Sequence, residues 1–298
     1  MQRTGSVPLL RHPYLLHLRL GFNLLLSPVY LWGVLLAGGG LGSADFWLGY
    51  LSLHLFLYGG TTAFNSYYDR DEGPIGGMLR PPPVDEGLLR FSLLVQALGL
   101  LPAALVGIPF LAAWLLLFLV FAAYSHPLVR LKARPLAALA AISLGQGAVG
   151  FALGWLAVRP AGLLGAPALL GMTSTALIVT GLYLVTQSYQ VDEDRRRGDR
   201  TLAVLLGARN SLRLALLPLA AGGGILLGWT WAVLAPAAAV PLALFFAAVA
   251  VSLWRWSSRI DGATVEENFR MAMRLTAGAS LGLSLYLLLA LAFGGAVS

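Results

Sequence analysis

The sequence predicts an all-α integral membrane protein, with nine transmembrane helices bundled around a central cavity that opens to the cytoplasmic side and to lipid. Of the 298 residues, 58% are hydrophobic and 11% are charged. A soluble domain carries about 25% charged residues. The long apolar runs approach the roughly 20 residues that a helix needs to cross a bilayer. They are continuous rather than alternating, which disfavours a transmembrane β-barrel.

Nine segments are expected to cross the membrane, and two of the boundaries between them are inferred. Residues 214–254 carry no charge, and a single helix of that length would measure about 60 Å, twice the hydrocarbon thickness. The chain must therefore turn back, near the segment GWTWAVLAP. Residues 107–109, Gly-Ile-Pro, divide residues 91–124 in the same way. The spans are residues 20–38, 46–64, 91–106, 108–124, 136–157, 167–186, 214–231, 234–254 and 275–293.

The distribution of charge predicts the orientation in the membrane. With the N-terminus in the cytoplasm and the C-terminus outside, 19 of the 20 basic residues are cytoplasmic, and only Arg159 is not. This agrees with the retention of Lys and Arg on the cytoplasmic side, as in a bacterial-type cell membrane. No basic stripe with interleaved aromatic residues indicates nucleic-acid binding. Twelve of the 13 acidic residues, all except Asp45, fall on the same side, so we expect the cytoplasmic loops to carry the chemistry.

Two of the spans carry polar stripes that continue into charged loops. Spacings of three and four residues keep each stripe on one face of an α-helix. A polar face within lipid is costly unless it faces the protein interior or a cavity. The first stripe comprises His54, Tyr58, Thr61, Asn65, Asp69 and Glu72, and the second comprises Thr180, Tyr183, Gln187, Gln190, Asp194 and Arg197.

The ends of the two stripes predict a metal–diphosphate site. Each places an amide and a carboxylate four residues apart, Asn65 with Asp69 and Gln190 with Asp194. Oxygen ligands without imidazole favour a hard cation such as Mg²⁺, and the chain contains no cysteine. Neighbouring arginines, among them Arg80, supply planar groups that bind phosphate oxygens. The membrane position indicates that the rest of the substrate is a lipid tail.

The alternative explanation is that these loops are simply solvated. A charged run after a membrane span is commonly a loop with local ion pairs, and one such run alone would favour that interpretation. Two runs that each continue a polar face within the membrane favour a site instead.

The same two segments resemble the signatures of the UbiA-type intramembrane prenyltransferase family. They read NSYYDRDEGPIGGMLRPPP and QVDEDRRRGDRTLAVLLG. The first family motif has Asn and two Asp at intervals of four residues, followed by Arg-Pro. The second has two Asp and a Gly at intervals of four, commonly followed by T-L-x-V. The segment AYSHPLVRLKARP is similar to the basic segment after the family's fourth helix. The resemblance therefore covers most of a single domain of residues 1–298, with motif loops at 65–88 and 190–209.

The first motif matches in part. Asn65 and Asp69 occupy its first two positions and Arg80 opens its Arg-Pro pair, but Gly73 stands at its third position. Glu72 lies three residues after Asp69, which on a helix would put it on the same face. We therefore expect Glu72 to supply the missing carboxylate.

The second motif also departs from the family pattern. Asp194 and Gly198 match it, whereas Gln190 replaces the first Asp and keeps an oxygen ligand without its charge. Residues 201–204 read T-L-A-V. With Gly73, this is similar to the naphthoate prenyltransferases of menaquinone synthesis, and members acting on 4-hydroxybenzoate are also similar.

The resemblance implies Mg²⁺-dependent transfer of a prenyl group from a polyprenyl diphosphate to a hydrophobic or aromatic acceptor, with a quinone precursor expected. Mg²⁺ neutralises the departing diphosphate so that the allylic C–O bond can ionise, and a cavity within membrane lipid keeps the carbocation from water. Asp69 and Asp194 would be catalytic. The metal ligands would be Asn65, Asp69, Glu72, Gln190 and Asp194, and the diphosphate would contact Arg80, Arg130, Lys132 and Arg195.

Polar and aromatic residues within the spans are candidates for a prenyl or acceptor pocket. Aromatic faces can stabilise a cation, although packing is the commoner role of a membrane tyrosine. For His54, a hydrogen-bonded core position is the default and a general base for the acceptor is the alternative. The pocket candidates are Asn23, His54, Tyr58, Tyr124, Tyr183 and Gln187.

Two other functions stay open at this point. A transporter or a lipid-diphosphate-binding protein could use the same helical scaffold, because transporters contain helices broken by Gly or Pro. The one-sided placement of the polar residues favours an active site over a transport path. A family member that has lost turnover is the other alternative, motivated by Gly73 and Gln190.

Overall fold

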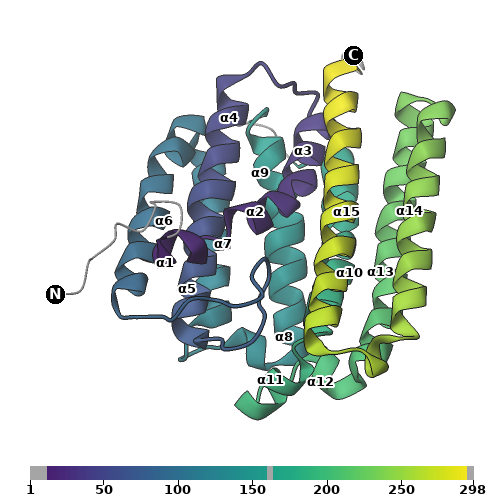
Figure 1. Ribbon diagram of the computed structural model, residues 1–298. Coiled ribbons are helices and arrows are strands. Elements are labelled where there is room, and N and C mark those ends of the chain that lie inside the picture. Colours follow the sequence, from purple (N-terminus) through teal and green to yellow (C-terminus); the bar gives the residue numbers. More distant parts are fainter. Residues whose placement is uncertain (1–11, 160–163, 294–298) are drawn as a thin grey trace.

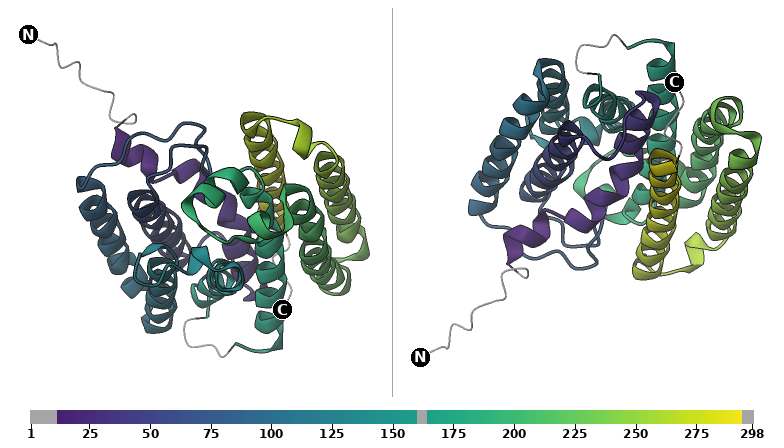
Figure 2. Two further views of the ribbon diagram at one scale, coloured as in Figure 1. Left: turned by 90° about the horizontal axis from the view of Figure 1, so that it is seen from below. Right: turned by 90° about the horizontal axis from the view of Figure 1, so that it is seen from above.

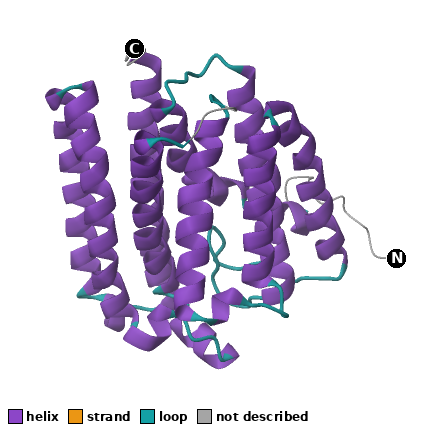
Figure 3. Ribbon diagram, turned by 180° about the vertical axis from the view of Figure 1, so that it is seen from behind, coloured by secondary structure: helices purple, strands orange, loops and turns teal. Residues whose placement is uncertain are grey.

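The protein is a multi-pass bundle of helices. The computed structural model describes residues 12–159 and 164–293, so Arg3 and Arg11, which were counted in the predicted topology, lie outside the described residues. In the described ranges helices and loops make up the fold (Figure 3), and the β-structure is one isolated bridge between Ile75 and Met78. The α-helices are α1 (Pro13–His17), α2 (Leu20–Asn23), α3 (Ser27–Leu36), α4 (Ala44–Leu51), α5 (Gly59–Asp69), α6 (Gly87–Val106), α7 (Ile108–Ser125), α8 (Pro135–Ala140), α9 (Gly150–Leu156), α10 (Ala166–Gln187), α11 (Val191–Arg197), α12 (Leu202–Leu206), α13 (Ala208–Trp229), α14 (Pro236–Ser257) and α15 (Val265–Phe293).

Eight helical segments of the described chain are long and apolar enough to cross a membrane. The remaining expected span, residues 46–64, is not among them. It forms one continuous helix from α4 through the π-helix Ser52–Tyr58 to α5. Its polar stripe lowers its hydropathy, so the predicted count of nine holds when this helix is included. The all-α membrane fold is confirmed.

The first span begins earlier than expected and is interrupted. Arg19 has a left-handed backbone, with φ 45°, and separates α1 from α2. A short 3₁₀ turn, Leu24–Leu26, then leads into α3. In Figure 1 these short segments lie obliquely before α3 rises along the bundle. The interruption carries Arg19 into the interior instead of leaving it in a cytoplasmic tail, where its charge alone had placed it.

The inferred turns between spans are confirmed. Gly107, with φ 144°, separates α6 from α7. The π-helix Thr230–Leu234 ends α13, and Pro236 begins α14. The last span starts at Val265, before the expected residue 275.

The helices pack in one continuous bundle (Figures 1 and 2). α10 packs against α13 and against the span formed by α8, the π-helix Ala141–Val149 and α9, while α3 lies against α9 and α15. The pair α13 and α14 forms one edge and α6 lies toward the opposite edge. The short helices α11 and α12 lie across one end of the bundle, as the view from below shows. The motif loops therefore lie at the same end.

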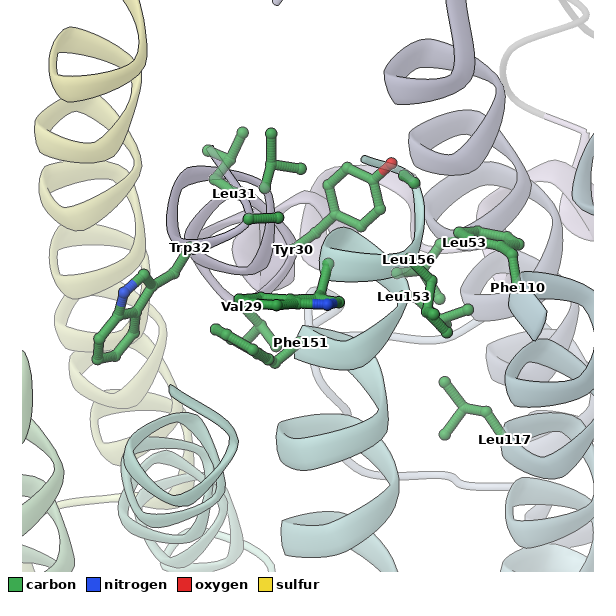
Figure 4. Packing of buried hydrophobic residues seen from close by; sticks show 14 of the residues in the cluster. Val29, Tyr30, Leu31, Trp32, Leu53, Phe110, Leu117, Phe151, Leu153 and Leu156 are labelled. Atoms are coloured by element: carbon green, nitrogen blue, oxygen red, sulfur yellow. The ribbon is translucent and has the colours of Figure 1, made fainter. Parts of the chain in front are cut away.

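The apolar core is centred on the contact between α3 and α9. Tyr30 and Trp32 of α3 are fully buried and lie close to Phe151 of α9 (Figure 4). Tyr30 also donates a hydrogen bond to the carbonyl of Phe46, at 2.9 Å. Because little hydrophobic force acts between helices in lipid, close packing of small residues provides much of the association. Gly154 is such a residue, because a Cβ there would overlap the carbonyl oxygen of Tyr30.

We expect Gly154→Ala to destabilise the bundle by about 1–3 kcal/mol, the usual cost of an overpacked core. The melting temperature of the purified protein in one detergent would measure this. Gly278→Ala is the matched control, because nothing lies within 4 Å of a Cβ at Gly278 on α15. An equal melting temperature for the two variants would contradict the close contact between α3 and α9.

Candidate functional site

Charged and polar side chains gather around a cavity of about 170 Å³ at the end of the bundle that carries α11. Helices α5 and α10 contribute from inside the bundle, and the segments after each helix close around the cavity from the end. The residues that line it are Arg19, Phe22, Asn65, Asp69, Asp71, Ile75, Gly76, Tyr124, Lys132, Tyr183, Thr186, Gln187, Tyr189, Gln190, Asp194, Arg197, Asp199 and Thr201.

The first motif reaches the cavity through the end of α5. Asn65 donates a hydrogen bond to Ser125 of α7, at 3.0 Å. Asp69 is the last residue of α5 and forms a buried ion pair with Lys132. Arg70 then adopts a left-handed backbone, with φ 48°, and ends the helix. The chain leaves the helical path at this point and turns over the cavity.

The second motif reaches the cavity after a bend. α10 ends at Gln187 and α11 begins at Val191. Burial raises the pKa of Asp194 to about 7, and the hydrogen bond that Thr201 donates to it at 3.1 Å opposes this effect. Burial therefore favours the neutral carboxyl of Asp194, and a cation bound beside it would favour the charged form.

Four carboxylates and three cationic side chains line the same cavity. Besides the pair of Asp69 with Lys132, Asp71 pairs with Arg197 at 2.5 Å, and Asp199 pairs with Arg130 at 3.0 Å. Buried charges are stable only when they are paired or bind an ion. The cavity thus concentrates both signs of charge at the end of an apolar bundle, as a charged ligand with a counter-ion would require.

The carboxylates fit a Mg²⁺ ion that is coordinated jointly by the protein and a substrate phosphate better than one coordinated by the protein alone. Within residues 12–159 and 164–293, no three or more His, Asp or Glu side chains are grouped closely enough to hold a metal ion. Mg²⁺ usually takes one or two protein carboxylates and completes its shell with water and substrate phosphate. Asp69 and Asp194 on the two sides of one cavity match that donor set.

Many of the residues expected from the sequence meet in this cavity. The eight are Asn65, Asp69, Tyr124, Lys132, Tyr183, Gln187, Gln190 and Asp194.

Glu72 does not join them. Its side chain is exposed, and its backbone N–H is what contacts the other motif, at 3.3 Å from Glu193. The expectation that it shares a face with Asp69 is wrong because α5 stops at Asp69. Asp71 lines the cavity instead, with a side chain 6% exposed.

Three expected phosphate-binding residues also lie elsewhere. Arg80 and Arg195 are exposed, and Arg195 pairs with Asp192 on the surface of α11. Arg130 is not among the residues that line the cavity, and it pairs with Asp199, which does line it. The cations that line the cavity beside Lys132 are Arg197 and Arg19, which donates a hydrogen bond to Ser66 at 2.6 Å. Arg197 belongs to the second polar stripe, so that spacing could have identified it, whereas Arg19 gave no signal beyond its charge.

A second cavity of about 110 Å³ continues into the bundle and shares Asn65 and Tyr124 with the first. It contains two further expected pocket residues, Asn23 and Tyr58. At the junction, the side chain of Gln187 donates a hydrogen bond to the hydroxyl of Tyr183, at 2.6 Å. That hydroxyl lies 3.0 Å from the hydroxyl of Tyr124. Tyr124 therefore lines both cavities, and Tyr183 and Gln187 are linked to it by hydrogen bonds on the side of the charged cavity.

His54 lines neither cavity. Its ring stacks on Tyr50 with centroids 4.1 Å apart, and its Nδ1 lies 3.1 Å from the carbonyl of Tyr50. His54 lies within the π-helix Ser52–Tyr58. A π-helix has a wider turn than an α-helix, which breaks the regular register of the predicted stripe. The core position is the role that the packing supports.

The chain matches the UbiA prenyltransferase family over residues 26–277. The protein belongs to this family. No curated protein gave a significant match to it.

Solved structures of UbiA homologues share the fold. A UbiA homolog from Archaeoglobus fulgidus bound to DMAPP and Mg²⁺ has a TM-score of 0.64 and 20% identity, over 92% of this chain and 99% of that one. The apo UbiA homolog from Aeropyrum pernix K1 has a TM-score of 0.63 and 20% identity, over 89% and 98%. A structure of digeranylgeranylglyceryl phosphate synthase has a TM-score of 0.57 and 15% identity, over 93% and 98%.

In this UbiA family member, we expect Arg130→Ala to cost about 3–5 kcal/mol of stability, because it leaves the buried carboxylate of Asp199 without its partner. The Arg130 guanidinium contacts both oxygens of Asp199 at 3.0 Å. Thermal unfolding in detergent would measure the loss. Arg195→Ala is the control, because the pair it breaks is exposed and contributes little. Similar melting temperatures for the two variants would show that the Arg130 pair is dispensable.

Proposed function

We propose that this protein catalyses the Mg²⁺-dependent transfer of a prenyl group from a polyprenyl diphosphate to an acceptor within the membrane. The observation that carries the proposal is a cavity lined by four carboxylates and three cations that adjoins a deeper cavity inside an apolar bundle. The charged cavity suits a diphosphate with its cation, and the membrane-embedded bundle suits an apolar chain. Related structures support this, since A. fulgidus UbiA homologs bind DMAPP or GPP together with Mg²⁺.

In the proposed reaction the charged side chains stabilise the departing diphosphate. Lys132, Arg197 and Arg19 line the cavity and would bind its oxygens as negative charge develops there. Asp69 and Asp194 would hold Mg²⁺, which when bound adds further neutralisation of the leaving group. Lys132 contacts Asp69 in the structure, so the amine is placed to exchange between that carboxylate and the ligand.

The segments around the cavity would keep water from the allylic cation. Ile75, which is buried, lines the cavity from the loop after α5. Tyr124 and Tyr183 lie where the polar cavity meets the deeper one. Their aromatic faces can stabilise positive charge once water is excluded.

We propose an aromatic quinone precursor as the acceptor. The support is the similarity of Gly73 and the T-L-A-V segment to the naphthoate prenyltransferases. An acceptor of the glyceryl phosphate class is the second candidate, because digeranylgeranylglyceryl phosphate synthase has a similar fold. We also propose that the N-terminus is cytoplasmic and the C-terminus outside. Since the chain has no cysteine, single introduced cysteines and an impermeant thiol reagent would test this orientation.

Purified protein incubated with labelled geranylgeranyl or a longer diphosphate tests the reaction directly. The acceptors should include dihydroxynaphthoate, hydroxybenzoate and a glyceryl phosphate lipid, each with and without Mg²⁺. We expect a prenylated product and released diphosphate only when Mg²⁺ is present. Transport of the diphosphate across vesicles without any product would favour a transporter. Tight Mg²⁺-dependent binding without product from any acceptor would favour a protein that has lost turnover.

A further inference from the structure

The two motif segments are joined by a closed ring of contacts on the outer side of the charged cavity. Arg197 of α11 pairs with Asp71 at 2.5 Å and with Glu193 at 2.6 Å. Glu193 in turn accepts hydrogen bonds from the backbone N–H groups of Glu72 at 3.3 Å and of Gly73 at 3.5 Å. Asp71 and Gly73 are two residues apart, so the contacts close a ring between the loop and α11. The side chains of Asp71, Glu193 and Arg197 are 6%, 13% and 22% exposed.

Gly73 leaves room for this ring. A Cβ at Gly73 would lie 2.5 Å from Oε2 of Glu193, closer than such atoms approach in proteins. This carboxylate of Glu193, which lies next to Gly73, is also the one that pairs with Arg197 and accepts hydrogen bonds from two backbone N–H groups of the loop. Any side chain at position 73 would therefore displace Glu193 or lift the loop from α11.

Gln190 adds a second contact between the same segments. Its Nε2 donates a hydrogen bond to the backbone carbonyl of Pro74, at 3.2 Å. A carboxylate at this position could not donate that bond, and its negative charge would face the carbonyl oxygen. The two motif positions that lack an acidic residue therefore take part in neighbouring contacts between the same loop and the second motif. Gly73 of the loop contacts Glu193, and Gln190 contacts Pro74 of the loop.

We infer that Gly73 and Gln190 are positioning residues that dock the loop of residues 71–74 onto α11 and so hold Asp71 and Arg197 at the cavity. They are not ligand positions that have lost their carboxylates. This inference concerns the site of the proposed prenyl transfer and rests on that function for its effect on activity. The docking itself is a property of the loops alone. It follows that adding Asp at either position separates the loops instead of completing a metal site.

Spin labels attached to introduced cysteines test the docking independently of any reaction. Glu72→Cys and Arg196→Cys place labels on exposed positions of the two segments, and no native cysteine competes for the label. The label separation should be narrowly distributed in the otherwise native protein. It should lengthen or broaden with Gly73→Ala and with Gln190→Glu. Gly262→Ala, a glycine with nothing within 4 Å of its Cβ position, is the control and should change nothing.

Binding provides the second readout. Mg²⁺-dependent affinity for geranylgeranyl diphosphate, measured by calorimetry, should fall about 10- to 100-fold with Gly73→Ala or Gln190→Glu. Losses of this size are usual for residues that position the binding side chains without contacting the ligand themselves. Glu193→Asp withdraws the carboxylate from position 73. The pair Gly73→Ala with Glu193→Asp should therefore lose less affinity than the two single losses combined.

The results that would overturn this inference differ from those that would overturn the proposed function. If the Gly73→Asp or Gln190→Asp variant binds Mg²⁺ more tightly and keeps the same label separation, the inference is overturned. Positions 73 and 190 would then be metal-ligand positions that have lost their carboxylates. Unchanged label separation in Gly73→Ala and Gln190→Glu would overturn the inference as well. If the native protein binds no diphosphate, the proposed function fails, while the label separations still decide whether the two residues dock the loop.

Discussion

Asp69→Asn is expected to lower the rate of prenyl transfer by about a thousandfold, comparable to the loss of a major electrostatic group in an active site. Asp69 is the one carboxylate that lies at the end of α5, lines the charged cavity and pairs directly with Lys132. Asparagine keeps its shape and removes the charge that would hold Mg²⁺ and orient the lysine. Single-turnover rates at saturating diphosphate, with Mg²⁺ varied, would measure the effect.

The control must separate catalysis from folding, because the Asp69→Asn substitution would leave the ammonium of Lys132 buried without its partner. Lys132 is 8% exposed. Melting temperatures of the variant with and without the diphosphate would reveal any such loss. Asp192→Asn is the matched surface variant, since Asp192 lies on α11 and is 71% exposed. Turnover by a folded Asp69→Asn protein at the rate of the Asp192→Asn protein would refute the assignment of Asp69.

The membrane spans and the meeting of the two motifs were predictable from the sequence because they depend on properties that act over many residues. Hydropathy summed over a span separates membrane helices from loops, and turns are required where uncharged runs exceed the bilayer thickness. The stripe from Tyr183 to Arg197 identified cavity residues even though α10 ends at Gln187 and α11 begins at Val191. The pairing of charged residues from separate segments, such as Lys132 with Asp69, could not be predicted from the spacing of residues along one helix.

The unexpected positions of Glu72 and Arg19 trace to single backbone positions. Among the residues that the structure describes, those with positive φ other than glycine are Arg19, Arg70 and Arg130, and all three stand at or beside the charged cavity. Arginine has no preference for the left-handed region, so nothing in the sequence indicates a break there. The left-handed backbone of Arg70 ends α5 before Glu72 can share a helix face with Asp69. The left-handed backbone of Arg19 places its own side chain at the cavity. Such strained positions cluster at functional sites, where the surrounding contacts hold them.

Asp71→Asn is expected to lower activity about a hundredfold, and Glu72→Gln to leave it within about twofold, which is the reverse of the order that helical spacing predicts. Asp71 lines the cavity and pairs with Arg197 at 2.5 Å, whereas the side chain of Glu72 is exposed. The substitution leaves Arg197 paired with Glu193 alone and removes one carboxylate from the cavity. Effects of this size are usual for groups that orient a site.

The two variants are closely matched, because each neutralises one acidic residue in the same short loop. Their kcat and KM for the diphosphate should be compared at several Mg²⁺ concentrations. For Asp71→Asn, the label separation between the two motif segments should be measured as well. If Asp71 acts only by docking the loop, Asp71→Asn changes the separation and KM but spares kcat at saturation. If its carboxylate contributes to the bound Mg²⁺–diphosphate, kcat falls as well and excess Mg²⁺ recovers part of the loss. A larger effect of Glu72→Gln would mean that the loop rearranges on binding and that α5 extends past Arg70 in the loaded protein.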